Sequence, residues 1–146
     1  MRRILVGYDG SDGGRRALDR AIAEAHDSHG RITVLSVANM PLDLDVPRNF
    51  GTLDDISANE GKALQPPRDV VAHLTEARER LAAAGLEANL TWTAGDPGTA
   101  ILETAREMRA QVIVLGEHHH GLLGNVFGAD VDAEVQREAG CEVILA

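Results

Sequence analysis

The chain has 146 residues, 44% of them hydrophobic, and its 14 basic and 23 acidic side chains give a formal net charge of −9 at pH 7. This length suits a single domain spanning residues 1–146, with a core built mainly from aliphatic side chains because only 3% of the residues are aromatic. The negative charge argues against binding to nucleic acids or to anionic membrane surfaces. No apolar run approaches the roughly 20 residues of a membrane span, so we expect a cytoplasmic protein.

The amino-terminal part predicts a strand, a helix and a second strand. Residues 4–8 form a short apolar run, and in the turn at 9–14 Ser11 or Asp12 can cap a helix. Gly30 is expected to end that helix before the second strand at 31–38. This spacing predicts a right-handed βαβ unit. The helix repeats apolar residues along one side, at Ala17, Leu18, Ala21, Ile22 and Ala25.

Residues 39–65 show no clear periodicity and are rich in proline, glycine and acidic residues. A segment this long within a compact domain is typical of a mobile loop or of a lid over a binding site. It follows the carboxyl end of a strand, where open α/β sheets bind their ligands. We therefore keep both interpretations, with the mobile loop first.

Two further helices and an intervening strand follow this loop. Pro66 and Pro67 open a helix that Gly85 closes, and residues 87–93 alternate as a strand at a sheet edge. Asp96 and Pro97 are the expected N-cap and first residue of the next helix. The predicted inward faces of the two helices are Val70, Val71, Leu74, Ala77 and Leu81, and Ala100, Ile101, Thr104, Ala105 and Met108.

Residues 112–130 form the stretch on which the functional interpretation depends. An apolar strand at 112–115 is followed by a loop that contains four glycines, and Asp130 can cap a helix with Val131, Val135 and Ala139 on one side. A glycine-rich turn between a buried strand and a helix N-terminus can present backbone N–H groups to a phosphate. The last strand is expected at 142–145, after Cys141, which is the sole cysteine and is interpreted as a packing residue.

These elements predict an α/β fold: an open, five-stranded parallel sheet with four helices covering both faces. Residues 112–146 resemble the carboxyl-terminal half of the universal stress proteins, and residues 4–11, 95–102 and 140–145 resemble further motifs of that family. The resemblance implies a Rossmann-like sheet of order 3-2-1-4-5. The last strand would then lie at an edge, where its apolar residues favour a homodimer through this strand, as the resemblance also implies.

The resemblance also implies where an adenine nucleotide would bind. In nucleotide-binding relatives, the aspartate matching Asp9 contacts the adenosine, beside Gly7 at the end of the first strand, and the positions of Val37 and Ala38 line the adenine. The phosphate side would be formed by the loop from Gly116 to Ala129, with His119 and Gly128 at two further positions of the family's motif. Equally, Asp9 fits an ordinary turn aspartate that accepts hydrogen bonds from nearby backbone.

The loop departs from the nucleotide-binding pattern at several positions. His119 stands in place of the second glycine, the spacer is one residue short, and Ala129 replaces the hydroxyl residue that follows Gly128. Asp130 also brings a carboxylate to the helix N-terminus that would otherwise attract phosphate. We therefore expect weak or absent ATP binding and a stress-response or regulatory module. The alternative is an ATP-binding sensor of the same family.

No metal site and no catalytic site is expected from the sequence. His118, His119 and His120 are adjacent, so they point in different directions, and no cysteine lies near them to complete a zinc site. Ser11 and Ser36 have no identifiable histidine and aspartate partners for nucleophilic catalysis. The chain is therefore not expected to be an enzyme.

Overall fold

The computed structural model describes residues 2–38, 67–117 and 129–146, and for residues 129 and 130 it describes the backbone. The predicted loop at 39–65 and most of the glycine-rich loop lie outside these residues. The elements, in chain order, are β1 (Arg3–Gly7), α1 (Asp12–Ser28), β2 (Arg31–Ala38), α3 (Arg68–Ala83), β3 (Ala88–Ala94), α4 (Pro97–Met108), β4 (Val112–Leu115), α5 (Ala129–Glu138) and β5 (Glu142–Leu145).

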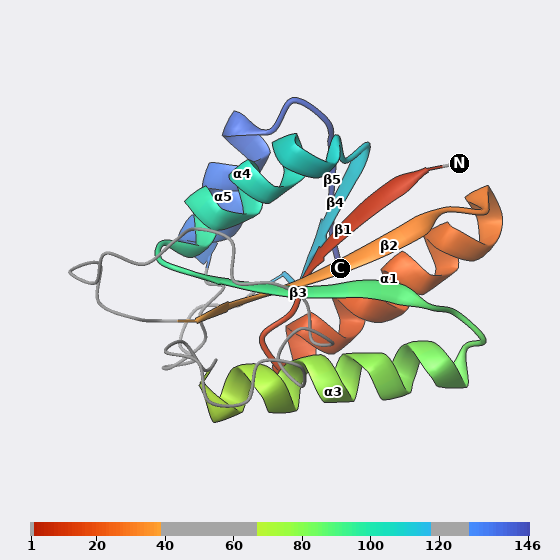
Figure 1. Ribbon diagram of the computed structural model, residues 1–146. Coiled ribbons are helices and arrows are strands. Elements are labelled where there is room, and N and C mark those ends of the chain that lie inside the picture. The colour runs from red at the N-terminus through yellow and green to blue at the C-terminus, as the bar shows by residue number, and fades with distance from the viewer. Residues whose placement is uncertain (1, 39–66, 118–128) are drawn as a thin grey trace.

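The five strands form one parallel sheet in the order β3-β2-β1-β4-β5. Helices α1 and α3 cover one face, and α4 and α5 cover the other (Figure 1). The predicted fold class and the strand order 3-2-1-4-5 are therefore confirmed.

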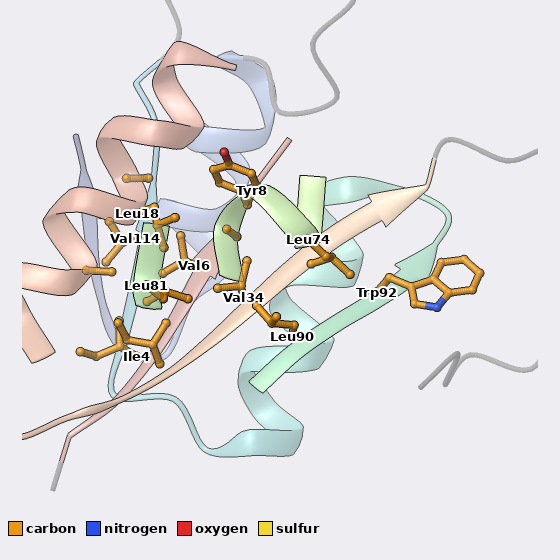
Figure 2. Close-up of a cluster of buried hydrophobic side chains, with 14 of the residues drawn as sticks. Ile4, Val6, Tyr8, Leu18, Val34, Leu74, Leu81, Leu90, Trp92 and Val114 are labelled. Carbon is orange, nitrogen blue, oxygen red and sulfur yellow. The ribbon is translucent and has the colours of Figure 1, made fainter. Parts of the chain in front are cut away.

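The central strands are buried on both faces, as their unbroken apolar runs predict. Successive side chains of a strand point to opposite faces. In β1, Ile4 and Val6 accordingly join the core beneath α1 and α3, whereas Leu5 joins the core beneath α4 and α5. Figure 2 shows the first of these cores, in which Leu18, Leu74 and the strand residues meet. The two cores hold β1 and β4 at the centre of the molecule.

Several predicted helix ends are confirmed. Ser11 caps α1, since its side chain accepts a hydrogen bond from the Gly14 N–H, and Asp96 caps α4 by accepting from the Thr99 N–H. Beyond α3, Gly85 has φ +75°, a left-handed conformation that suits glycine. Each of these ends satisfies backbone groups that the helix itself leaves unpaired.

Three details of the prediction are wrong. Helix α1 ends one residue earlier than predicted, because His29 rather than Gly30 adopts the left-handed conformation (φ 52°) and donates its N–H to the Ala25 carbonyl. Asp130 does not cap α5, because the helix already includes Ala129. Leu102 is only 8% exposed although it lies outside the predicted inward stripe, because α4 packs against α5 as well as against the sheet.

A polar network closes the core at the carboxyl end of β1. The Tyr8 side chain is fully buried, and its hydroxyl donates a hydrogen bond to Glu76 Oε1 of α3. Arg15 of α1 donates to the same oxygen from Nε at 2.8 Å. Burial and the Glu76 carboxylate raise the pKa of Tyr8 above its usual range, while the hydrogen bonds from Arg15 and Tyr8 lower the pKa of Glu76. The network ties α1 and α3 to the end of β1.

Tyr8 is the only tyrosine in the sequence, so phenolate absorbance reports its ionisation alone. We expect it to ionise well above the ordinary value of about 10. Since the folded pKa is raised, the neutral phenol stabilises the fold at lower pH, and that contribution is lost as the pH rises above about 10. Glu76→Gln is expected to move the titration to lower pH, whereas the exposed Glu79→Gln on the same helix should not. Titration at the ordinary value, unmoved by Glu76→Gln, would contradict this account.

Candidate functional site

The turn after β1 is organised by Asp9. Its Oδ1 accepts hydrogen bonds from the Ser11 N–H, at 3.0 Å, and from the Ser11 hydroxyl. Ser11 Oγ in turn accepts from the Gly14 N–H at 3.0 Å and so caps α1. Asp9 therefore supports the helix cap, which favours the interpretation of a turn aspartate.

The end of β4 lies directly against the first turn of α1. A Cβ atom added at Gly116 would come within 2.2 Å of the carbonyl carbon and oxygen of Gly13. Because real Cβ atoms do not approach backbone this closely, only glycine fits at Gly116. The contact sets the separation between the turn after β1 and the chain that leaves β4.

Gly14 makes a related contact with the turn. A Cβ added at Gly14 would lie 2.9 Å from Asp9 Oδ1, so the absence of a side chain admits the carboxylate beside the helix. Gly13 and Gly14 were predicted to lie in the turn at 9–14, whereas both are buried residues in the first turn of α1. Glycine within a helix costs about 1 kcal/mol relative to alanine, so two together in a helix indicate a structural reason such as this contact.

Arg16 is a further residue at this edge of the sheet whose role was not predicted from the sequence. Its Nη2 donates to the Glu117 carbonyl at 3.0 Å, and its Nε lies 3.5 Å from the Ala146 carbonyl, which accepts the Glu117 N–H at 2.8 Å. The guanidinium therefore holds the chain that leaves β4 against the carboxyl terminus of the chain. Nothing in the local sequence links these positions, which are brought together only by the strand order.

Four of the remaining predicted positions lie at the same edge of the sheet: Gly7, Val37, Ala38 and Gly116. Gly7 is the last residue of β1, Val37 and Ala38 are buried at the end of β2, and Gly116 follows β4. These three strands are neighbours, so the structure brings the described positions to the carboxyl edge of the sheet. Ala129 is the first described residue of α5. His119 and Gly128 lie outside the described residues.

The part of the chain that the structure describes comprises residues 2–38, 67–117 and 129–146. No group of three or more His, Cys, Asp or Glu side chains in these segments is arranged to hold a metal ion. None of the helices in the same segments is long and apolar enough to cross a membrane. The run His118–His120, which raised the metal question, lies outside them.

The strand order and the glycine at the end of β4 define an open α/β protein of the kind that binds ligands at its topological switch point. The chain belongs to the universal stress protein family, whose model matches residues 1–146. It is 32% identical to a universal stress protein of Thermus aquaticus over 146 residues, covering 99% of this chain and 98% of the relative. A universal stress protein of Bacillus subtilis is 28% identical over 153 residues, covering 99% and 98%.

The structural comparison agrees with this assignment. A crystal structure of a universal stress protein in complex with cAMP is similar with a TM-score of 0.69 and 28% identity, covering 99% of this chain and 96% of that one. A family member from Burkholderia pseudomallei has a TM-score of 0.65 and 28% identity, covering 99% and 94%. The family resemblance inferred from the sequence is therefore confirmed.

The contact at Gly116 can be tested by adding one methyl group. Gly116→Ala is expected to destabilise the protein by about 1–3 kcal/mol, because the new Cβ meets the backbone of Gly13 rather than a movable side chain. Gly140→Ala is the matched control, since a Cβ there meets nothing within 4 Å, and its effect should stay within about 0.5 kcal/mol. Urea unfolding compares the two. Equal midpoints for both variants would show that the contact does not constrain the fold.

Proposed function

We propose that the chain is a stress-response or regulatory module without enzymatic activity that binds ATP weakly or not at all. The observation that carries this proposal is the acidic start of α5, the helix to which the glycine-rich loop leads. Asp130 and Asp132 both fall within its first turn. Carboxylates there take the favourable interaction with the positive end of the helix dipole and repel phosphate groups.

The residue types along the loop support the same proposal. Ala129 has no hydroxyl to donate at the position where nucleotide-binding members carry serine or threonine. His119 adds a side chain where close backbone approach to a phosphate favours glycine. The use of Asp9 in the cap of α1 also fits a structural role at the adenosine side.

The second candidate function is an adenine-nucleotide sensor, and the similar structure in complex with cAMP favours it. In that case we propose a site formed by Gly7, Asp9, Val37, Ala38 and Gly116, together with His119, Gly128 and Ala129. A cyclic monophosphate carries fewer negative charges than ATP and would be repelled less by the acids of α5. The two candidate functions therefore differ in the ligands they accept.

Calorimetry at neutral pH is expected to show weak ATP binding or none. The combined change His119→Gly and Ala129→Ser should improve ATP binding by about tenfold, since one restored hydrogen bond to a charged group contributes about 1.5 kcal/mol or more. Asp130→Asn should also improve it, whereas Asp27→Asn, at the far end of α1, serves as the control. Low-micromolar ATP affinity in the unaltered chain would overturn the first proposal. Binding of cAMP without ATP would favour the sensor.

We also propose that the chain acts as a homodimer through β5. This strand pairs with β4 on one side, and no other described strand pairs with it. Val143, Ile144 and Leu145 are apolar and only half-buried, and an open edge of this kind favours pairing with a second copy. A two-fold axis would satisfy the open edges of both copies and close the assembly.

The register of β5 identifies the backbone groups available to a partner. Ala146 donates its N–H to Leu115 and accepts from Glu117, so its backbone groups face β4. Because these directions alternate along a strand, the groups of Ile144 also face β4, whereas those of Val143 and Leu145 point outward. A proline at position 143 therefore removes an outward donor and leaves the pairing with β4 intact.

Light scattering is expected to show a dimer for the unaltered chain and a monomer of unchanged secondary structure for Val143→Pro. Ile144→Pro is the informative control, because it removes a donor that faces β4 and should lower the thermal stability of the protomer itself. An unaltered chain that is monomeric at micromolar concentration would rule out the dimer. A Val143→Pro variant that remains dimeric would show that the dimer interface lies elsewhere than at the edge of β5.

A further inference from the structure

The amino edge of the sheet carries a cavity at the opposite end of β4 from the candidate nucleotide site. It has a volume of about 190 Å³ and lies between the carboxyl-terminal ends of α4 and α5, which pack together on one face of the sheet (Figure 1). Its apolar lining is formed by Leu102, Ala105, Ala110, Ile113, Ala139 and Cys141. Ile113 is fully buried, whereas Ala110, Ala139 and Cys141 are half-buried, so the cavity has an apolar floor and an open mouth.

The volume limits what this cavity can hold. An apolar cavity of about 150 Å³ is enough to bind benzene, whereas pockets for larger ligands measure about 300–1,000 Å³. A cavity of about 190 Å³ therefore suits a group of roughly six to eight non-hydrogen atoms. The aliphatic lining favours a short alkyl chain or one ring.

The charges around the mouth select the polar end of the ligand. Arg106 and Arg109 line the cavity, are exposed, and form no ion pair with any described residue. Glu138 also lines it but is paired with Arg137 at 3.4 Å. The ends of α4 and α5 each contribute about half a negative charge, so about one net positive charge remains from the two guanidinium groups. This balance suits a ligand with a single negative charge.

We propose that this cavity binds a small apolar monocarboxylate, with its hydrocarbon end against Ile113 and Leu102 and its carboxylate at Arg106 and Arg109. A planar carboxylate matches the fork of donors on a guanidinium group. The site is independent of the proposed nucleotide function, because it lies at the other edge of the sheet.

Cys141 allows the occupancy of the cavity to be measured directly, because it lines the cavity and is the only cysteine in the sequence. Burial raises the pKa of its thiol, and Glu142 adds to the effect. We therefore expect the thiol to react slowly at neutral pH. A ligand in the cavity should shield it further, which makes the rate of alkylation by N-ethylmaleimide a measure of occupancy.

The probes are hexanoate and two molecules of similar length, hexanol and hexylammonium. We expect millimolar hexanoate to slow the alkylation of Cys141 at least threefold, and the other two to slow it much less. The double variant Arg106→Gln and Arg109→Gln should lose this protection. A second double variant, Arg20→Gln and Arg68→Gln, removes the same charge from exposed sites on α1 and α3, which cover the opposite face of the sheet, and should keep it.

A titration of the unaltered protein, followed by amide NMR shifts, keeps the test independent of variant folding. Hexanoate should shift the signals of Ala105, Ala110 and Gly140 more than those of the carboxyl edge. Absence of both protection and shifts would overturn the proposal. Equal protection by hexanol would show that the cavity binds apolar molecules without selecting for the carboxylate. Stronger protection by hexylammonium would show that the mouth of the cavity favours a positively charged ligand, contrary to the proposal.

Discussion

The close approach of Gly116 to Gly13 is the constraint on which the carboxyl edge of the sheet depends. It brings the end of β4 into backbone contact with the first turn of α1, where no side chain fits between them. The same turn holds the Asp9 carboxylate against Gly14 and is capped by Ser11. Arg16, one turn further along α1, then binds the chain that leaves β4. Gly13 and Gly116 therefore set how closely α1, in the first half of the chain, approaches the end of β4, in the second half.

Much of the fold was predictable because its strands carry a strong local signal. β2, β4 and β5 were predicted with the boundaries observed, since each is an apolar or alternating run with polar or glycine residues at its ends. Their order could not come from periodicity, which identifies an element but not its neighbours. It came from the family resemblance, carried by motifs at 4–11, 95–102 and 112–146. Local patterns and family motifs thus supplied different parts of the same answer.

The errors have two sources. His29 closes α1 in a left-handed conformation with a local hydrogen bond from its N–H to the Ala25 carbonyl, although glycine is the residue that sequence rules select there. Leu102 is buried because α4 has a second neighbour, α5, which periodicity against a single sheet cannot anticipate. The network of Tyr8, Arg15 and Glu76 joins residues up to 68 positions apart. No short-range pattern marks such a pairing, so only the assembled fold reveals it.

One electrostatic rule accounts for the different character of the two ends of β4. Acidic residues are favourable at helix N-termini and basic residues at C-termini. At the carboxyl edge, α5 begins with acidic residues, which under the proposed function take the place of a phosphate at this helix end. At the amino edge, Arg106 lies in the last turn of α4 and Arg109 is its C-cap residue. Their two full positive charges exceed the half negative charges at the C-termini of α4 and α5, which border the cavity. A surplus of positive charge therefore remains beside the cavity, although the chain as a whole carries a net charge of −9. Under the two proposals, the same preference disfavours an anion at one edge of the sheet and leaves room for one at the other.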